Sequence, residues 1–369
     1  MLALHTFAYR AYRRRPYLSE MDRMSRRAIS IEDIARAAGV SHSTVSRALR
    51  DNPLISADVR ERVQQLAREM GYTPNAIAQS LQMQRTSTIG LVVTSIADPF
   101  YTDVVKGIEA EARKAHLSVF LSASHNDLDQ ETQVIETFHR RRVDGILIAS
   151  SRYSTQQAAE LARIRVPIVL INSQAESHAD ELRSVAVDDY GGARMAVEHL
   201  LQLGHRAIGY IGAGNRPKSN RQRLAGYRDA LAAAGVPGQA AWVTIAPVED
   251  TLHEDDVAAG QARLGSLLHA DVTAIFCYND TIAIGVLLAC REQGIAVPQA
   301  LSVIGFDDIE MGQYLTPPLT TIHQPKASLG RTAMRMLLDL LDERPAQSYV
   351  LSPSLVTRGS TMQRIEDGR

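Results

Sequence analysis

The sequence predicts a small all-helical N-terminal domain followed by an α/β core built on parallel sheets. Three observations predict this fold class. Short helical patterns separated by glycines occupy about residues 30–71, and short apolar strand patterns alternate with helical ones beyond Thr88. The chain has 369 residues, of which 45% are hydrophobic, and this exceeds the size of one ordinary hydrophobic core. We therefore expect two or three domains.

The first helix is expected to begin after Ser30. Ser30 and Asp33 match a capping box, in which the hydroxyl accepts a free backbone N–H and the carboxylate lies at the positive end of the helix dipole. The apolar face that follows consists of Ile34, Ala35 and Ala38. Gly39 is expected to end this helix, because glycine adopts the left-handed conformation that helix ends require.

Two further short helices follow. The second is expected to be capped by Ser41 and to run through Leu49. The third is expected to run from about 57 to 70, with Ser56 as its cap and Gly71 as its stop. Their inner faces consist of Val45, Ala48 and Leu49 on the second helix and of Val59, Val63, Leu66 and Met70 on the third.

Two short helices around a glycine turn, followed by a third, are typical of the helix-turn-helix, whose second helix lies in the DNA major groove. A protein-binding three-helix bundle would have the same helices. The exposed face of the second helix favours DNA, because it carries short donors and acceptors and one arginine fork that can bond guanine. These side chains are Ser41, His42, Ser43, Thr44, Ser46 and Arg47.

The segment 72–81 has two interpretations. Asn75 can cap one or two further helical turns. The segment is either a plain linker or a short helix that enters the minor groove and wedges Leu81 between base pairs, which bends the DNA.

The core is expected to contain nine or more strands in two sheets. Apolar runs without a period of two, separated by helical stretches, imply parallel sheets covered on both faces. Two sheets fit the size of a hydrophobic core better than one large sheet. The predicted strands are 89–96, 117–122, 145–149, 167–172, 184–187, 207–212, 241–245, 274–278 and 301–306.

The formal net charge of −1 is the sum of two unlike parts. Residues 1–85 carry 14 Lys and Arg against 8 Asp and Glu, or +6, and the remaining residues carry 26 against 33, or −7. Opposite charges predict two different roles. Residues 1–28 are a basic extension without the apolar region of a secretory signal. This extension is either a solvated arm that touches DNA or translated upstream sequence, with the true start at Met21 or Met24.

Several classes of site are excluded by the residues present. Cys277 and Cys290 belong to no set with metal-binding spacing, so we expect buried free thiols. No apolar run approaches the roughly 20 residues that cross a bilayer. Gly212-Ala213-Gly214 follows a strand, but Pro217 stands where a dinucleotide fingerprint needs glycine. Without a Walker A, HExxH or GxSxG motif, we expect no catalytic residues, no cofactor and no metal.

A series of motifs in order along 29–358 resembles the lactose-repressor (LacI/GalR) family of bacterial transcription regulators. Each motif alone is weak evidence, but the ordered series is specific. The motifs are Ile31-Glu32-Asp33-Ile34-Ala35, Ala38-Gly39-Val40-Ser41, Thr44-Val45-Ser46-Arg47, Gly71-Tyr72-Thr73-Pro74-Asn75, Asp98-Pro99-Phe100, Val143-Asp144-Gly145, Leu203-Gly204-His205-Arg206, Arg223-Leu224-Ala225-Gly226-Tyr227, Tyr278-Asn279-Asp280, Gly305-Phe306-Asp307-Asp308 and Pro317-Pro318-Leu319-Thr320-Thr321-Ile322.

The resemblance implies a homodimer whose two helix-turn-helix units read a pseudo-palindromic DNA operator, with paired hinge helices between them. By position, His42, Ser43 and Arg47 would contact bases and Leu81 would be the minor-groove wedge. The remaining DNA-binding candidates, better suited to phosphate contacts or caps, are Ser41, Thr44 and Asn75.

The resemblance also implies a core similar to periplasmic sugar-binding proteins, with two doubly wound subdomains joined by three crossings. A small polar effector, a sugar or sugar derivative, would bind in the cleft between them. The implied effector residues are Phe100, Tyr101, Ser150, Asn172, Ser219, Arg223, Asn279, Asp307 and Gln324. Asp307 is the expected anchor, because a carboxylate can accept two hydroxyl bonds. Simpler roles stay open: packing for Phe100, a solvated charge for Arg223 and a helix cap for Asn279 or Asp280.

The implied domains are 29–74 for the helix-turn-helix, 75–87 for the hinge helix and linker, and 88–369 for the core. Within the core, one subdomain would comprise 88–186 and 318–345, and the other 187–317 and 346–369. The sequence thus predicts a cytoplasmic, nucleoid-associated, ligand-responsive repressor rather than an exported binding protein or a cleft enzyme. The segment after Arg358 lacks leucine heptads, which favours a dimer over a coiled-coil tetramer.

Overall fold

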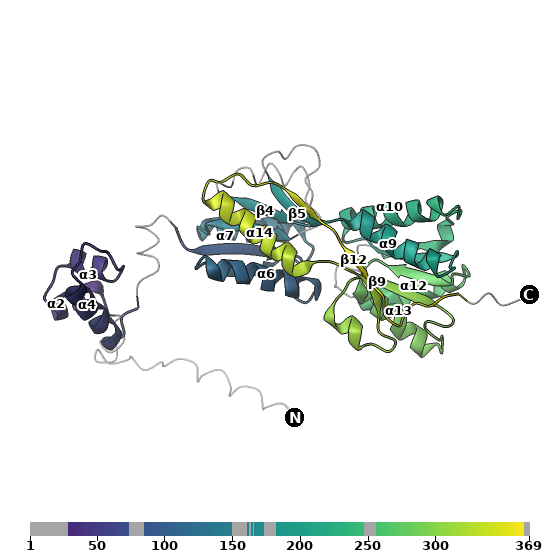
Figure 1. Cartoon of the computed structure of the whole chain (residues 1–369), viewed down its shortest axis with the longest axis horizontal. Coiled ribbons are helices and arrows are strands. Elements are labelled where there is room, and N and C mark those ends of the chain that lie inside the picture. The colour runs from purple at the N-terminus through teal and green to yellow at the C-terminus, as the bar shows by residue number, and fades with distance from the viewer. Residues whose placement is uncertain are drawn as a thin grey trace, which may run out of the picture. The chain divides into compact units, whose positions relative to one another are not determined.

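The computed structural model describes residues 29–73, 85–149, 161, 164, 166–172, 182–246 and 256–364. The chain divides into two compact units, with the division between Met83 and Gln84 (Figure 1). The predicted extension 1–28 and nearly all of the predicted hinge and linker, 75–87, lie outside the described residues.

The described residues of the smaller unit form three helices, α2 (Ile31–Ala38), α3 (His42–Ala48) and α4 (Ala57–Glu69). The capping box of α2 is confirmed. The Ser30 hydroxyl accepts from the Asp33 N–H at 3.3 Å, and the Asp33 carboxylate accepts from the Ser30 N–H at 3.0 Å. Gly39 ends α2 with φ of 66°, in the left-handed region that favours glycine.

The core of the smaller unit is formed by residues three or four apart on each of the three helices. The fully buried members are Ile34, Ala38, Val45, Ala48, Val63 and Ala67. One predicted cap is wrong in detail: Ser56 occupies the N-cap position of α4, but its side chain makes no capping hydrogen bond. The packing of Val63 and Ala67 against the other two helices, and not a serine cap, holds α4 in this unit.

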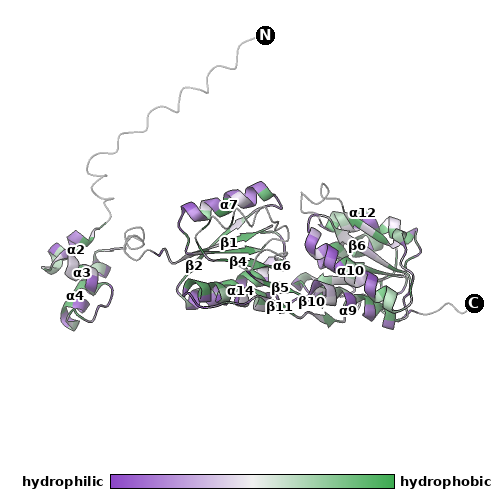
Figure 2. Cartoon of the chain, turned by 90° about the horizontal axis from the view of Figure 1, so that it is seen from above, coloured by the Kyte–Doolittle hydropathy of each residue, from purple (hydrophilic) through white to green (hydrophobic). Residues whose placement is uncertain are grey.

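The larger unit contains two six-stranded sheets, as the sequence predicted. The first has the order β11-β5-β4-β3-β1-β2, and all its pairings are parallel. Helix α7 (Leu128–Arg140) covers one face, and α6 (Phe100–Lys114) and α14 (Lys326–Leu341) cover the other (Figure 2). The strands are β1 (Thr88–Val93), β2 (Ser118–Ala123), β3 (Gly145–Ala149), β4 (Ile168–Ile171), β5 (Arg183–Val187) and β11 (Tyr349–Leu351).

The second sheet has the order β12-β10-β9-β8-β6-β7. Helices α9 (Asp189–Gln202) and α10 (Pro217–Ala233) pair on one face, and α12 (Asp256–Leu268) and α13 (Asp280–Glu292) pair on the other. The strands are β6 (Ile208–Ala213), β7 (Val243–Ala246), β8 (Ala274–Cys277), β9 (Ser302–Asp307), β10 (Thr320–His323) and β12 (Ser354–Val356). The central strands of both sheets are continuous apolar runs buried between two helical layers, and they appear hydrophobic in Figure 2.

Strand pairing moves two boundaries that the sequence had placed elsewhere. β10 falls in the stretch assigned to the first subdomain but pairs with β9 in the second sheet. β11 falls in the stretch assigned to the second subdomain but pairs with β5 in the first sheet. β12 is antiparallel to β10, so the second sheet is not purely parallel. The chain crosses between the sheets after β5, after β10 and between β11 and β12.

The contact between α6 and α14 depends on glycine. A Cβ built on Gly107 of α6 would lie 2.2 Å from the carbonyl oxygen of Ala327 in α14, a distance that backbone atoms cannot tolerate. We expect Gly107→Ala to destabilise the larger unit by about 1–3 kcal/mol, because the two helices must separate. The melting temperature measures this loss.

Gly265→Ala is the matched control for that substitution. Gly265 also lies within a helix, α12, but a Cβ there would meet no atom within 4 Å. We expect the control to raise stability by up to about 1 kcal/mol through helix propensity alone. Equal effects of the two substitutions would contradict the steric explanation.

Candidate functional site

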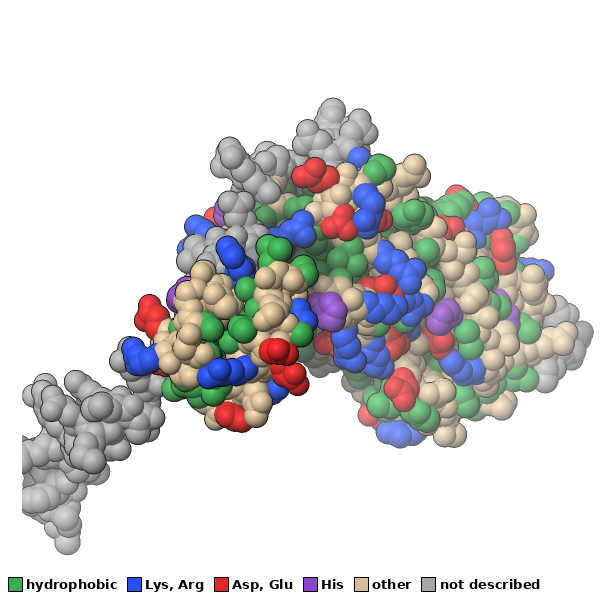
Figure 3. All heavy atoms as spheres, turned by 60° about the vertical axis from the view of Figure 1, so that its left-hand side comes forward, with side chains coloured by type: hydrophobic (Ala, Val, Ile, Leu, Met, Phe, Trp, Pro, Cys, Tyr) green, Lys and Arg blue, Asp and Glu red, His purple; other side chains and the backbone are tan. Residues whose placement is uncertain are grey.

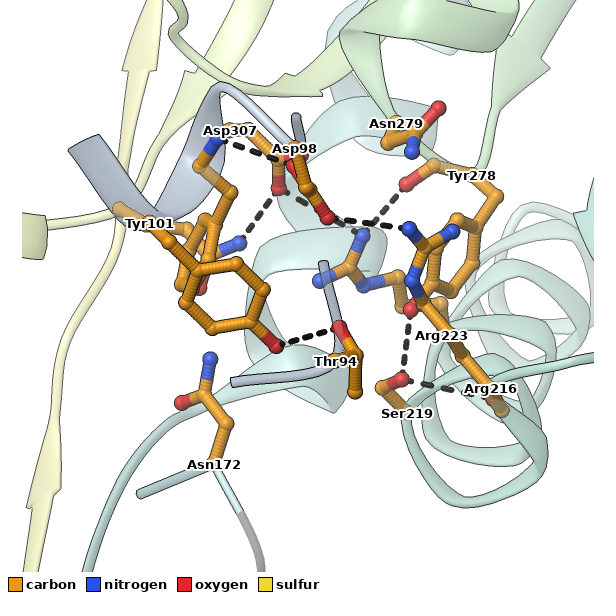
Figure 4. A pocket seen from close by; sticks show the side chains of 12 residues that line it. Thr94, Asp98, Tyr101, Asn172, Arg216, Ser219, Arg223, Tyr278, Asn279 and Asp307 are labelled. Atoms are coloured by element: carbon orange, nitrogen blue, oxygen red, sulfur yellow. Dashed lines mark hydrogen bonds and ion pairs between the residues drawn. The ribbon is translucent and has the colours of Figure 1, made fainter. Parts of the chain in front are cut away.

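A polar pocket lies where strand ends of the two sheets meet (Figure 4). All eight predicted effector residues that the structure describes line it, and Ser150 lies outside the described residues. The lining residues are Thr94, Asp98, Phe100, Tyr101, Asn172, Arg216, Ser219, Arg223, Tyr278, Asn279, Asp307 and Gln324. Both subdomains contribute, as expected for a cleft at the carboxyl ends of parallel strands.

Arg223 is buried at the centre of this pocket and is only 4% exposed, so it is not a solvated surface charge. Its Nε donates to Asp189 Oδ1 at 2.8 Å, and its Nη1 donates to the carbonyl oxygen of Tyr278 at 2.5 Å. The guanidinium also stacks on the rings of Phe306 and Tyr278, 3.7 and 4.3 Å from their centroids. Burial opposes its charge, but the attraction of Asp189 raises the pKa of Arg223 above its usual range.

Asp307 ends strand β9 and presents its carboxylate to the same space as Arg223. Its Oδ1 accepts from Gln324 Nε2 at 2.6 Å and lies 3.8 Å from Arg223 Nη1. Burial raises the pKa of Asp307 to about 8, against the opposing charge of Arg223. The buried Oε1 of Gln324 has no hydrogen-bond partner among the described residues. The pair therefore offers a ligand both a carboxyl group and an unused acceptor.

The backbone at Asp307 and Asp308 adopts a conformation that residues other than glycine rarely adopt. Asp307 has φ of 120° and Asp308 has φ of 54°. Such a conformation costs on the order of 1–3 kcal/mol for each residue. The buried ammonium of Lys326 donates to the carbonyl oxygens of both residues, so it holds the loop that orients the Asp307 carboxyl group. The sequence reasoning did not identify Lys326.

Phe100 and Tyr101 form an aromatic wall in the first turn of α6. Their rings meet edge to face, with centroids 5.3 Å apart. The Tyr101 hydroxyl accepts from Thr94 Oγ1 at 3.1 Å and donates to the Ala149 carbonyl oxygen at 3.2 Å. Burial raises the pKa of Tyr101 above its usual range. The aromatic wall is therefore held rigidly against β1 and β3.

Ser219 lies on α10 and closes another side of the pocket. Its hydroxyl is 2.6 Å from the Tyr278 hydroxyl, and Figure 4 shows the two side chains facing each other. Asn172 follows β4 with φ of 55° and also lines the pocket. Short polar side chains from both subdomains therefore line this pocket.

The structure resolves which member of the Asn279-Asp280 pair forms a helix cap. Asn279 Oδ1 accepts from the Ile282 N–H at 2.8 Å and caps α13, and Asn279 also lines the pocket. Asp280 points away from the pocket lining, where it accepts from Thr321 Oγ1 at 2.5 Å and from the Ile309 N–H at 2.8 Å. Within the described residues, the Asn279 side-chain NH2 group donates one hydrogen bond, to Asp256 Oδ2 at 2.7 Å. Its second hydrogen can be donated to a ligand.

Arg216 was not among the predicted site residues. It follows strand β6 and lies between two carboxylates, with Nη2 3.0 Å from Asp98 Oδ2 and Nη1 2.8 Å from Asp256 Oδ2. Burial opposes its charge, but Asp256 and Asp98 raise the pKa of Arg216 well above its usual range. Its position after a strand end was the available signal, since the other lining residues occupy such positions too.

A second candidate site is the exposed face of α3 in the smaller unit. The Ser41 hydroxyl accepts from the Thr44 N–H at 3.2 Å and lies 2.9 Å from Ser43 Oγ, so it caps α3. His42, Ser43 and Arg47 are exposed, and the Arg47 side chain has no hydrogen-bond or ion-pair partner among the described residues. Val45 is buried, as the core interpretation requires. Asn75 and Leu81 lie outside the described residues.

Other classes of site receive no support from the described residues. Within them, no group of three or more His, Cys, Asp or Glu could hold a metal ion. Cys277 and Cys290 are buried free thiols, and burial raises the pKa of both. Among the described helices, none combines the length and apolar character that crossing a membrane requires. On the face that Figure 3 shows, both basic and acidic side chains occur among the described residues.

Comparison with known proteins explains why two such different sites occur in one chain. Residues 30–75 match the model of the bacterial regulatory proteins of the lacI family, and 197–361 match a periplasmic binding protein-like domain. The ribose operon repressor of Haemophilus influenzae is 38% identical over 339 residues, which cover 90% of this chain and 98% of the relative. The chain belongs to the LacI family.

Two solved structures of the LacI family resemble this protein over most of its length. The Lac repressor dimer bound to operator and the anti-inducer ONPF has a TM-score of 0.80 and 28% identity, and the match covers 91% of this chain and all of that one. A LacI family regulator from Enterococcus faecium with bound ribose has a TM-score of 0.65 and 30% identity, and the match covers 75% of this chain and 100% of that one.

Membership of the LacI family makes this protein a DNA-binding transcriptional regulator and not an enzyme. The three-helix unit that carries His42, Ser43 and Arg47 is the part matched by the LacI family model. The pocket that contains Arg223 and Asp307 lies in the larger unit. Residues 197–361 of that unit, which include both residues, match the periplasmic binding protein-like domain.

Proposed function

We propose that this LacI-family protein is a transcriptional repressor that binds a pseudo-palindromic operator as a homodimer and responds to a sugar or sugar derivative. The observation that carries this proposal is the pocket itself. It combines an aromatic wall, a buried arginine and a carboxyl group with an adjacent free acceptor, which is the chemistry that recognises a ring with several hydroxyl groups. As a DNA-binding protein it would act in the bacterial cytoplasm, in association with the nucleoid.

On the DNA side, we assign base contacts to the exposed side chains of α3. Arg47 can donate two hydrogen bonds to guanine O6 and N7, and His42 and Ser43 can each donate or accept. Ser41 and Thr44 bond each other at the start of α3, so we assign them to phosphate positioning. Asn75 as a hinge cap and Leu81 as a minor-groove wedge remain part of the proposal, together with the hinge segment 75–87.

On the effector side, we assign Asp307 and Arg223 to the sugar hydroxyls and Phe100 and Tyr101 to the face of the sugar ring. Asn279, Gln324, Asn172 and Ser219 would provide further polar contacts from both subdomains. Ser150 is retained as a proposed contact. Ribose is the first candidate, because a relative is named as a ribose operon repressor and another binds ribose.

The two sites would communicate through closure of the pocket. A ligand that contacts both subdomains favours the closed arrangement, and a change in closure would alter the spacing of the two hinge segments in a dimer. Binding at the pocket and binding at DNA would then change each other's affinity by the same factor.

A thermal-shift screen of the purified protein tests the proposal. The panel contains neutral sugars, sugar phosphates, sugar acids and nucleobases. We expect a sugar to raise the melting temperature, because a ligand at 100 times its Kd stabilises the native state by about 2.7 kcal/mol. The same sugar should change the affinity for duplexes enriched from a random pool. A panel without any stabilising ligand, or a stabilising sugar without effect on DNA affinity, would contradict the proposal.

A further inference from the structure

The proposed sugar contacts leave one strongly charged group of the pocket without a role. The guanidinium of Arg216 is 3.0 Å from Asp98 and 2.8 Å from Asp256, and it is only 15% exposed. Asp98 and Asp256 are 15% and 5% exposed, so water screens these charges poorly. Both NH2 groups of the guanidinium already donate to a carboxylate, Nη1 to Asp256 and Nη2 to Asp98. Figure 4 shows the bond to Asp98.

The charge of Arg223, the second arginine of the pocket, is also paired with carboxyl groups. Arg223 donates to Asp189 at 2.8 Å and lies 3.8 Å from Asp307. Among the described residues that line the pocket, every arginine therefore has a carboxylate within ion-pair distance. An anionic group that entered would find no unpaired cation there and would lie beside the carboxylate of Asp98.

We propose that Asp98 is a specificity-determining residue that makes this pocket accept uncharged polar ligands and reject anionic ones, because it occupies the arm of Arg216 that a phosphate or carboxylate would bind. The inference rests on the proposed sugar-responsive function and narrows its ligand class to uncharged sugars and polyols. Arginine is well suited to bidentate binding of phosphate and carboxylate, so Arg216 without Asp98 would favour the opposite class.

Geometry gives this role to Asp98 and not to Asp256. Asp98 lines the pocket, whereas Asp256 lies behind it and also accepts a hydrogen bond from Asn279 at 2.7 Å. Asp98 follows β1 in the first subdomain and Arg216 follows β6 in the second, 118 residues later, so their ion pair spans the pocket. A ligand that contacts both subdomains must bind next to this pair.

Asp98→Asn is a suitable test because it removes the charge and keeps the local structure. Asp98 Oδ1 accepts from the Phe100 N–H at 3.0 Å at the start of α6, and asparagine retains this oxygen. Arg216 remains paired with Asp256 in the variant. A second variant, Asp98→Asn with Arg216→Gln, removes the cation as well and serves as the matched control. Cooperative melting without ligand shows that both variants fold.

Binding is measured by calorimetry and thermal shift at constant ionic strength, with ribose, ribose 5-phosphate and inorganic phosphate as probes. The wild-type protein should bind neither ribose 5-phosphate nor phosphate. Asp98→Asn should bind at least one of them with a Kd at least about tenfold below the highest anion concentration at which the wild type shows no binding, since hydrogen bonds to charged groups contribute about 1.5–3 kcal/mol. The double variant should lose this gain.

The outcomes separate the specificity of Asp98 from the sugar-responsive function. Ribose 5-phosphate binding to the wild type as tightly as to Asp98→Asn, or no gain of either anion by Asp98→Asn, overturns the role of Asp98. A gain that persists in the double variant overturns it too, because Arg216 is then not the anion ligand. If Asp98→Asn gains anion binding while the wild type binds no sugar, the specificity role stands and the sugar-responsive function fails.

Discussion

Replacing Asp307 with asparagine is expected to weaken the response of this repressor to its effector by about tenfold or more, while its affinity for DNA is retained. The carboxyl group lies beside Arg223 and accepts from Gln324. Asparagine would keep the Gln324 bond but replace the second carboxyl oxygen with an NH2 group, which cannot accept a hydrogen bond from a ligand hydroxyl. A lost or unsatisfied hydrogen-bond partner of this kind costs about 1–3 kcal/mol of binding free energy, which raises the Kd of the effector by roughly tenfold or more. Thermal shift with the effector and DNA binding with and without it measure the two properties separately.

Asp308→Asn is the matched control for this prediction. Asp308 is the next residue, but its carboxylate accepts from Arg358 at 2.6 Å and lies 2.9 Å from His323 Nδ1, and it does not line the pocket. The control should lower stability modestly and keep the full ligand-induced shift. An undiminished response in Asp307→Asn, or an equal loss in Asp308→Asn, would show that Asp307 is not the effector anchor.

Asp307→Asn should also change how the stability of the protein depends on pH. Burial raises the pKa of Asp307 from an ordinary value of 3.8 to about 8, so the folded protein holds a proton that the unfolded chain releases near pH 4. The contribution of this group to the free energy of unfolding is fully present below about pH 4. It is lost as the pH rises to about 8, at on the order of 1.4 kcal/mol for each pH unit. Asp307→Asn should therefore melt higher than the wild type at pH 8 and similarly near pH 4. Parallel melting profiles would contradict the burial of an ionisable group here.

Replacing Arg47 with alanine is expected to relax base preference more than it lowers nonspecific affinity for DNA. Arg47 is exposed on α3, next to buried Val45 and Ala48, so its removal leaves the packing of the three-helix unit intact. A bidentate arginine–guanine contact provides about 1–3 kcal/mol of discrimination against other bases. The ratio of Kd values for an enriched duplex and a scrambled duplex, at one salt concentration, measures the loss.

Arg36→Ala removes the same charge from another exposed position of the same unit. Arg36 lies in the last turn of α2, and its side chain is 81% exposed and 3.5 Å from Asp33. This control should leave the ratio of specific to nonspecific affinity nearly unchanged. Equal losses on enriched and scrambled duplexes in Arg47→Ala would assign Arg47 to phosphate binding rather than to base recognition.

The three-helix unit was largely predictable because its signals are local. The capping box of Ser30 and Asp33, the left-handed Gly39 and the serine that starts α3 are each decided by bonds within four residues. Ser56 was the exception. It stands at the predicted N-cap position, but its side chain makes no capping hydrogen bond.

The α/β core was predictable where the strands are continuous apolar runs between helical patterns. All nine predicted strands correspond to observed ones, because continuous apolar runs are typical of strands between two helical layers. β10, β11 and β12 were missed as strands and, for β10 and β11, also assigned to the wrong subdomain. β10 pairs with β9, β11 with β5 and β12 with β10, and these pairings join separate segments that no local pattern encodes.

By itself, the sequence determined the order of the elements, the exposed polar face of α3 and the strand ends at which pocket residues such as Asp307 would lie. These features depend on local backbone preferences and on the period of apolar residues. Only the tertiary structure decided that Asn279 caps α13 while Asp280 braces the neighbouring loop, and that Arg216 is paired with Asp98 and Asp256. The reason is physical: a buried charge takes its partner from whichever segment folding brings within about 4 Å, and Asp98 and Arg216 are 118 residues apart.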